Sequence, residues 1–247
     1  MDLFLEDLQV YVVNLRRRSD RRKHMKEILP MSLAVEFTSE WEREFDGAQM
    51  EAKDLRALGI GLFPWRIDSE NFWWARDLKF GEIGCTLSHL ACWRRALESG
   101  RQLFLVLEDD VSLSPDFCNR VLAGINRARR RRVEIGLVYL GRVPLEPDLG
   151  PAPDVPELVI PGYSHCTYGY VMSRDAAAKL LAVGLERDVI PIDEFLPAMY
   201  LDHPRADVRA RYQKCINALA FSPDLVIQLP KEEAGSDTEE SSFAKLD

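Results

Sequence analysis

Three consecutive acids, Glu108, Asp109 and Asp110, directly follow the apolar run 103–107. Like charges repel and an ionised carboxylate needs water or a cation, so packing alone does not account for them. In an extended segment residues i and i+2 point the same way, and we expect Glu108 and Asp110 to face one cation while Asp109 points elsewhere. Oxygen ligands suit Mg²⁺ or Mn²⁺, which share their coordination sphere with substrate phosphates. The pattern predicts a divalent-metal site, the alternative being a solvated loop or a helix N-cap.

A basic turn, residues 14–22, carries five arginines between an apolar run and a predicted helix. Backbone N–H groups and the helix dipole favour anions at such a turn, so a diphosphate would fit there. On charge patterning alone, a solvated basic face is the more common outcome. Neither GxGxxG nor GxxxxGK[ST] occurs in the sequence, which removes support for Rossmann-dinucleotide and P-loop functions.

Apolar runs typical of strands alternate along the chain with segments of helical periodicity. The strands and helices that they predict must position the three acids and the basic turn. Such an alternation indicates an α/β fold with a mostly parallel central sheet flanked by helices, and these sheets bind ligands at the carboxyl ends of their strands. If the first two strands are parallel, Asn14 and the three acids share one rim. Strands are predicted over 8–15, 103–107, 135–140 and 168–173, and helices over 20–29 (capped by Ser19), 85–99 and 175–183.

Two later stretches differ in composition from the rest. Between Gly141 and Gly162 the sequence is rich in Pro and acid, which suits an excursion over the surface. From Lys231, six acids and two lysines give a formal charge of −4, half of the chain's −8. We therefore expect a single domain over 1–230 and a solvated, mobile acidic tail over 231–247.

Composition excludes several classes of protein. The 247 residues are 47% hydrophobic and 29% charged, which is typical of globular chains. A net charge of −8 argues against a nucleic-acid binder that acts through a generally basic surface. No apolar run is long enough to span a membrane, and the acidic N-terminus does not resemble a signal peptide, so the sequence as it stands suggests the cytoplasm. The five cysteines form no CxxC pair and are expected to be free thiols.

Four blocks of the sequence stand out together: YVVNLRRRSDRR (11–22), GEIGCTLSHLACW (81–93), LFLVLEDDV (103–111) and YGYVMSRDAAAKLL (168–181). On these blocks the sequence resembles glycosyltransferase family 25, which includes lipooligosaccharide and procollagen galactosyltransferases. A further segment, PIDEFLPAMY (191–200), together with AFSPDLV (220–226) and the SDTEESS tail, is most similar to the catalytic half of the procollagen enzymes. The resemblance implies a GT-A-type fold, UDP-galactose as the donor, Mn²⁺ or Mg²⁺ as the cofactor, and inversion at the anomeric carbon.

The same resemblance assigns roles to individual positions. Ser88 and His89, in the second block, are not expected to form a hydrolase pair, because neighbours on a helix do not face one another and no GxSxG motif surrounds them. The alternative to a place at the donor site is that these two residues form an ordinary polar helix face. The resemblance places Glu108 and Asp110 on the metal and Asn14, Arg17, Asp20, Arg21, Ser88, His89 and Asp109 around the donor nucleotide sugar.

A metal-assisted transfer also needs a carboxylate that removes the proton of the acceptor hydroxyl. Asp193 and Glu194 are the candidates, because they lie between Pro191 and Pro197 on an apolar segment. Burial beside apolar neighbours would raise the pKa of such a carboxyl. The sequence leaves open which of the two acts, and Asp193 would alternatively be the N-cap of a helix over 194–200.

The acceptor is less defined than the donor. The resemblance favours hydroxylysine of a collagen-like peptide, with a lipooligosaccharide or another glycan as the alternative. An ER-lumenal location would follow if the chain were a trimmed domain of a procollagen-type enzyme. The rival from another class is a catalytically inactive binding module with the same fold.

Two further groups of residues have both a functional and a structural interpretation. His165 and His203 would complete the metal shell, although a lone histidine more often has a structural role. Aromatic residues cluster between Trp65 and Trp74. They would form either a lid that stacks on a sugar or a small core under a long loop.

Overall fold

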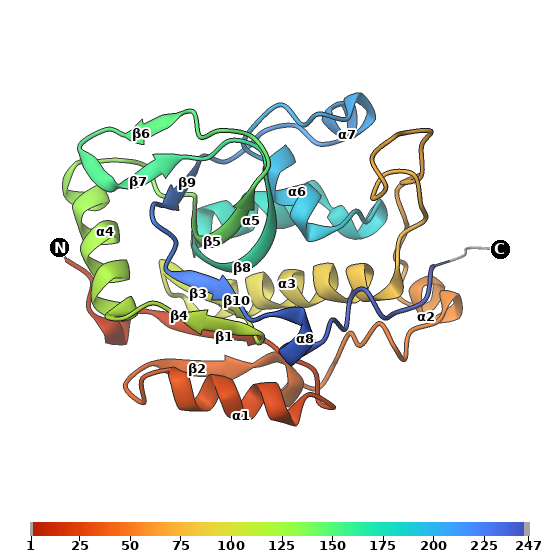
Figure 1. Ribbon diagram of the computed structural model, residues 1–247, viewed down its shortest axis with the longest axis horizontal. Coiled ribbons are helices and arrows are strands. Elements are labelled where there is room, and N and C mark those ends of the chain that lie inside the picture. The colour runs from red at the N-terminus through yellow and green to blue at the C-terminus, as the bar shows by residue number, and fades with distance from the viewer. Residues whose placement is uncertain (1, 245–247) are drawn as a thin grey trace.

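The computed structural model describes residues 2–244, and an eight-stranded sheet runs through its centre (Figure 1). A separate ladder of two short strands, β4 and β10, lies beside it. The strands are β1 (Gln9–Val13), β2 (Ala34–Phe37), β3 (Leu103–Glu108), β4 (Val111–Leu113), β5 (Leu137–Pro144), β6 (Gly150–Ala152), β7 (Val155–Ile160), β8 (Ser164–Ser173), β9 (Ala218–Phe221) and β10 (Val226–Gln228).

Helices cover both faces of the sheet. Short 3-10 turns join several elements, at Leu5–Asp7, Thr38–Glu40 and Leu185–Arg187. The α-helices are α1 (Ser19–Ile28), α2 (Ala52–Ala57), α3 (Phe80–Ser99), α4 (Phe117–Arg130), α5 (Arg174–Val183), α6 (Ile192–Ala198), α7 (Ala206–Arg211) and α8 (Lys231–Ala234).

The order of the strands in the sheet is β2-β1-β3-β8-β5-β9-β7-β6. Strand β1 pairs in parallel with β2 and β3, and β5 pairs in parallel with β9. The antiparallel pairings of β8 and β7 with their neighbours mean that, within residues 2–244, six of the eight strands run in one direction. The predicted α/β class with a mostly parallel sheet between helices is confirmed.

Alternating residues of the strands build two cores. Because successive side chains of a strand point to opposite faces, Tyr11 packs on the side of α3, α5 and α6, whereas Val10 and Val12 pack on the side of α1 and α4. Phe104 and Leu105 divide in the same way on β3. Helix α3 is buried along most of its length, which explains why its apolar residues occupy more than one stripe.

Several boundaries differ from the expected ones. Helix α3 begins at Phe80, five residues earlier than predicted, because the Glu82 carboxylate accepts the Lys79 backbone N–H in a capping box. Ser19 is the first helical residue of α1, and its neighbour Arg18 is the N-cap, so the predicted serine cap is wrong. Asp193 lies inside the first turn of α6, and the N-cap is the residue before that helix.

The expected solvated, mobile tail is also corrected, for residues 231–244; the remaining 245–247 lie outside the described residues. This part, called here the C-terminal segment, packs against the start of α3. The Phe80 N–H donates to the Ser242 carbonyl, and the Gly81 N–H donates to Ser241 Oγ. Ala234 and Ala244 are buried. These contacts offset the unfavourable composition that suggested disorder.

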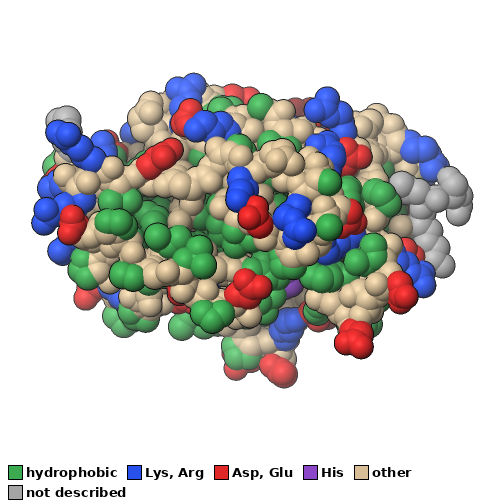
Figure 2. All heavy atoms as spheres, turned by 90° about the horizontal axis from the view of Figure 1, so that it is seen from above, with side chains coloured by type: hydrophobic (Ala, Val, Ile, Leu, Met, Phe, Trp, Pro, Cys, Tyr) green, Lys and Arg blue, Asp and Glu red, His purple; other side chains and the backbone are tan. Residues whose placement is uncertain are grey.

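Three further observations concern the surface charges, the helices and the cysteines. Basic and acidic side chains are interspersed on the face shown in Figure 2, without an extended basic area on that face. Within residues 2–244, no helix combines the length and the apolar character needed to cross a bilayer. The five cysteines are unpaired.

Candidate functional site

The parallel strands β1 and β3 bring their polar ends together, as predicted. Val13 pairs with Glu108, so Asn14 and Asp109 leave the sheet side by side. Asn14 Nδ2 donates to Asp109 Oδ2 at 2.6 Å, and the Arg21 guanidinium donates to Asp109 Oδ1 at 2.8 Å. Burial raises the pKa of Asp109 to about 6, against the opposing effects of the Arg21 charge and the Asn14 hydrogen bond. Both oxygens of Asp109 therefore have partners from the protein.

Glu108 and Asp110 have fewer partners. Glu108 Oε1 accepts from the Thr167 hydroxyl at 2.7 Å. Asp110 Oδ2 accepts from Gln228 at 3.1 Å, while Asp110 Oδ1 is buried with no hydrogen-bond partner. Burial and the negative charges of Asp110 and Asp193 raise the pKa of Glu108 well above its usual range. A divalent cation would relieve this repulsion and give Asp110 Oδ1 a partner, so the two carboxylates fit such an ion.

Two cavities meet at this rim. The smaller, the rim cavity, has a volume of about 100 Å³ and reaches Asn14, Arg21, Ser88 and the acids 108–110. The larger, the main cavity, has a volume of about 280 Å³ and extends to Asp193, His165 and Trp73. Residues that line both are Cys85, Glu108, Gln228, Ser236 and Thr238.

The basic turn is neutralised from within the protein. Asp237, on the C-terminal segment, forms ion pairs with Arg17, Arg18 and Arg21 at 2.5, 2.7 and 3.4 Å. Arg21 also donates to the carbonyl of Ala234. The anion that these arginines hold in the structure is thus a carboxylate of the chain itself. Binding of a diphosphate at this turn stays a prediction.

Not every residue assigned to the donor site lines a cavity. Asp20 is 65% exposed at its side chain and binds Arg18, which lowers the pKa of Asp20 to about 2. Asp20 lines neither cavity, and its assignment to the nucleotide site stays a prediction. Arg17 lies outside both cavity linings and binds Asp46, a buried acid of the rim cavity that the sequence pattern did not reveal.

Ser88 and His89 are consecutive residues of α3 but have different surroundings. Ser88 borders the rim cavity, and its hydroxyl donates to the backbone carbonyl of Gly84. His89 is fully buried, with Nδ1 2.9 Å from the Tyr170 hydroxyl and Nε2 3.9 Å from Glu108 Oε1. Burial lowers the pKa of His89 to about 3, so the ring is neutral.

Asp193 faces the main cavity. Its Oδ1 atom lies 3.2 Å from the Thr167 hydroxyl, which also contacts Glu108. A hydroxyl carries one proton, so Thr167 donates to one carboxylate at a time. Burial raises the pKa of Asp193 to about 6, and the opposing charge of His165 and the Thr167 hydrogen bond reduce that effect. Thr167 connects the predicted metal acids with the predicted base.

Both carboxylate oxygens of Glu194 accept hydrogen bonds from the protein. Its carboxylate accepts from Tyr163 Oη, from Trp74 Nε1 at 2.9 Å and from His203 Nε2 at 2.7 Å, and lies 3.3 Å from His165 Nε2. Burial alone would raise the pKa of Glu194, but the two histidines hold it well below its usual range. His165 and His203 therefore contact Glu194, and the idea that they complete a metal shell with the rim acids gains no support from these contacts.

The aromatic cluster has a buried part and an exposed part. Trp65 is buried, stacks on the Arg205 guanidinium at 4.3 Å and donates to the Trp73 carbonyl. Phe72 and Trp73 are exposed, and Trp73 borders the main cavity with Arg76 packed on its ring. The burial of Trp65 fits the core interpretation, and a lid that stacks on a sugar stays a prediction for the exposed Phe72 and Trp73.

Comparison with known proteins assigns the family. The model of glycosyltransferase family 25 (LPS biosynthesis protein) matches residues 7–138. An inactive glycosyltransferase 25 family member 3 from Homo sapiens is 34% identical over 95% of this chain and 39% of its own length. Procollagen galactosyltransferase 2 from Homo sapiens is 32% identical over 95% of this chain and 38% of its own length, and procollagen galactosyltransferase 1 from Danio rerio is 33% identical over 95% and 39%.

The chain therefore belongs to glycosyltransferase family 25, as its sequence blocks predicted. It spans about two fifths of the length of these curated relatives.

Proposed function

We propose that this chain is the catalytic unit of an inverting, metal-dependent glycosyltransferase that moves galactose from UDP-galactose to an acceptor hydroxyl. The observation that carries the proposal is a group of three carboxylates at the two cavities, two of which, those of Glu108 and Asp193, contact the Thr167 hydroxyl. Glu108 and Asp110 repel each other at the rim, and Asp193 faces the adjoining main cavity. Family membership favours a sugar transfer as the chemistry of this arrangement.

The roles follow from what each side chain contacts. Glu108 and Asp110 would hold Mn²⁺ or Mg²⁺, which when bound neutralises charge on the diphosphate leaving group. Asn14 and Arg21 border the rim cavity and would bind the nucleotide side of the donor. Asp193 would accept the proton of the acceptor hydroxyl, because its pKa of about 6 leaves it ionised near neutral pH and still able to take up a proton.

Asp193 is preferred to Glu194 as the base for a geometric reason. Glu194 already accepts hydrogen bonds from Tyr163, Trp74 and His203, and its lowered pKa makes proton uptake unfavourable. We assign Glu194 the role of orienting α6 and His165.

The proposed acceptor is a hydroxylysine of a collagen-like peptide. Trp65, Trp73, Val143 and Leu145 line the main cavity, and apolar and aromatic walls suit an extended, Pro-rich chain. Two similar relatives carry the name procollagen galactosyltransferase. A glycan acceptor is the alternative, because the family description refers to LPS biosynthesis.

A second candidate is a family member that has lost catalysis. It is favoured by the 34% identity to relatives named inactive or probable inactive glycosyltransferase 25 family member 3. Against it, Glu108, Asp110 and Asp193 are all present and are joined through Thr167 and the cavities.

The test is release of UDP from UDP-galactose in the presence of Mn²⁺, with and without EDTA. Mass spectrometry would follow addition of one hexose to a hydroxylysine-containing Gly-X-Y peptide, with a glycan acceptor assayed in parallel. We expect EDTA-sensitive turnover that Asp193→Asn removes. Absence of turnover with every nucleotide sugar, together with absence of metal-dependent UDP binding, would leave the inactive alternative.

A further inference from the structure

A second set of possible metal ligands lies beside the rim acids. Cys85 and His89 are four residues apart on α3, so they lie on the same side of the helix. Glu108, at the end of β3, faces them. One ligand atom from each of the three residues lies within 4.8 Å of the other two, and His89 Nε2 is 3.9 Å from Glu108 Oε1.

The His89 ring indicates that this cluster is built for a ligand. The ring is fully buried, and its Nε2 atom has no hydrogen-bond partner. On the opposite side, Nδ1 contacts the Tyr170 hydroxyl, which itself accepts from Trp93 Nε1 at 2.8 Å. A histidine that binds a metal through one nitrogen is typically held by a hydrogen bond at the other. The neutral state of His89 is also the one that binds metals.

We propose that Cys85, His89 and Glu108 form a site for a borderline-soft divalent cation of the Zn²⁺ class. A thiolate, an imidazole and a carboxylate together favour such an ion over Mg²⁺ or Mn²⁺, which prefer oxygen. Around tetrahedral zinc, ligand atoms lie about 3.3–3.7 Å apart. Side-chain rotations that shorten the present separations by about 1 Å would satisfy that geometry.

Binding changes the protons of the site in a defined way. The Cys85 thiol loses its proton to solvent as the sulfur–metal bond forms. His89 carries its single proton on Nδ1, where the Tyr170 hydroxyl accepts it. Three protein ligands would leave a fourth position open, and two of these ligands, Cys85 and Glu108, line both the rim and the main cavity.

One consequence of this site rests on the proposed function. Glu108 belongs to both ligand sets, so an ion held by Cys85 and His89 would withdraw it from the pair with Asp110. Zn²⁺ would then inhibit the Mn²⁺-dependent transfer. The binding itself does not depend on any transferase activity.

Co²⁺ is the probe for the experiment, added to the chain without a polyhistidine tag. We expect a thiolate-to-cobalt charge-transfer band at a stoichiometry of one, which added Zn²⁺ removes. The band should be lost in Cys85→Ser. It should persist in Cys166→Ser, which changes another cysteine of the main cavity, and in Cys118→Ser, on α4. No band in the wild type, or a band that survives Cys85→Ser, overturns the proposal.

A measurement on the wild type covers the case in which Cys85→Ser does not fold. Zn²⁺ should slow alkylation of Cys85 at least tenfold while leaving that of Cys118 unchanged, as read by peptide mass spectrometry. Equal alkylation of Cys85 with and without Zn²⁺ also overturns the proposal. A cobalt band without UDP-galactose turnover would refute only the transferase, whereas turnover without a band would refute only the zinc site.

Discussion

Two runs of consecutive acids, 108–110 and 193–194, are arranged by the same rule but with different results. In each, one carboxylate is fully bonded to the protein: Asp109 to Arg21 and Asn14, and Glu194 to aromatic and histidine side chains. All five acids border a cavity, but the carboxylates of Glu108, Asp110 and Asp193 have fewer partners from the protein.

The difference lies in what remains unsatisfied. At 108–110, two carboxylates are left close together, and Glu108 and Asp110 need positive charge. At 193–194, a single carboxylate is left beside the Thr167 hydroxyl, and the raised pKa of Asp193 suits it to take up a proton. Neighbouring acids thus acquire different chemistry because their partners differ, as in other sites where environment separates two carboxylates.

The largest effect is expected for Asp193→Asn. Losing the base should lower kcat about 10²- to 10⁴-fold, because general-base catalysis contributes that range. Mn²⁺-dependent UDP binding should stay near wild type, since Asp193 does not line the rim cavity. Steady-state kinetics and UDP titration measure the two effects. A wild-type kcat in Asp193→Asn would show that another residue takes the proton.

At the neighbouring acid, Glu194→Gln should mainly change the free energy of unfolding. Removing the buried charge that accepts hydrogen bonds from Tyr163, Trp74 and His203 should cost about 3–5 kcal/mol of unfolding free energy, measured by urea denaturation at neutral pH.

The stabilisation by Glu194 should depend on pH in a defined direction. The folded pKa of Glu194 lies below its unfolded value, so its contribution is complete above about pH 4.5 and is lost as pH falls further. The wild type and Glu194→Gln should therefore converge in stability on acidification. A constant difference down to low pH would contradict the assignment.

At the other acid run, Asp110→Asn should weaken Mn²⁺-dependent UDP binding and turnover about 10- to 100-fold, the size of effect seen when a metal site loses a supporting group. Asp116→Asn is the matched control, because Asp116 is an exposed acid on the following loop. Isothermal titration with and without Mn²⁺ separates the two. Equal losses in both variants would indicate a general charge effect.

Transfer should also depend on pH through Asp193. Its pKa of about 6 means that the base is protonated below that value, so kcat should fall about tenfold for each further unit of acidification. Above it, the rate should reach a plateau as Asp193 stays ionised. A pH–rate profile checks this limb, and an acid limb near pH 4 would show that burial does not raise the pKa of the base.

The smallest effect is expected at the C-terminal segment. Asp237→Asn weakens three ion pairs with Arg17, Arg18 and Arg21, and we expect a loss of about 1–2 kcal/mol. Thermal unfolding should show a melting temperature lower by a few degrees. Asp175→Asn, an exposed acid on α5, serves as the control. An unchanged melting temperature would mean that the segment adds no stability.

The rim was predictable from sequence because its signals are local. An apolar run that ends in Glu108 and another that ends in Asn14 indicate parallel strands with a shared polar edge, and that edge is present. The bonds of Asp193 and Glu194 were not predictable. Thr167 reaches Glu108 because β8 inserts between β3 and β5, and no local pattern announces that insertion.

The C-terminal segment shows a different reason for failure. Its acids and serines have the composition of a disordered tail. Their partners are the arginines near residue 18, more than 200 positions away. Complementary charge from a distant segment overrides local composition, and only the three-dimensional arrangement reveals it.

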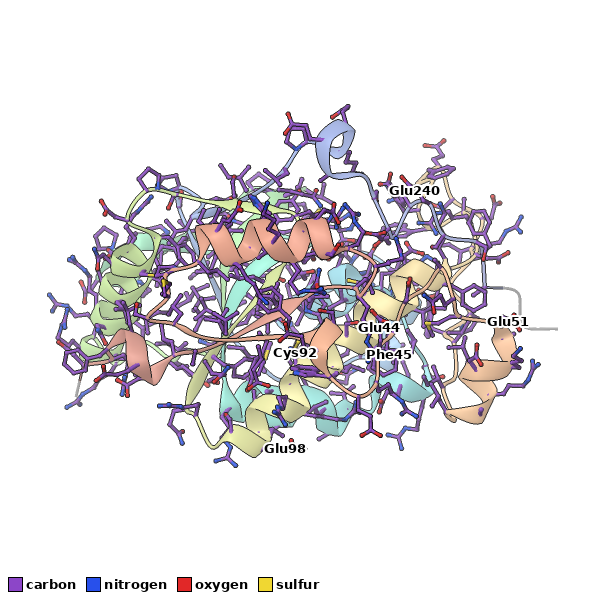
Figure 3. All side chains as sticks on the ribbon, turned by 90° about the horizontal axis from the view of Figure 1, so that it is seen from below. Glu44, Phe45, Glu51, Cys92, Glu98 and Glu240 are labelled. Atoms are coloured by element: carbon purple, nitrogen blue, oxygen red, sulfur yellow. The ribbon has the colours of Figure 1, made fainter. Side chains whose placement is uncertain are left out.

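The start of α3 has a consequence for which substitutions the protein can accept. Glu44 and Phe45 lie beside this helix (Figure 3), and a Cβ added at Gly84 would come within 2.4 Å of the Phe45 carbonyl oxygen. A Cβ at Gly47 would lie 2.4 Å from Gly81, and one at Gly81 would lie 2.7 Å from the backbone of Thr238. Three distant stretches of backbone thus touch with no side chain between them. In a saturation-mutagenesis screen, these uncharged positions should be as intolerant as the acids they surround, and even alanine at Gly81 would separate the C-terminal segment from the helix.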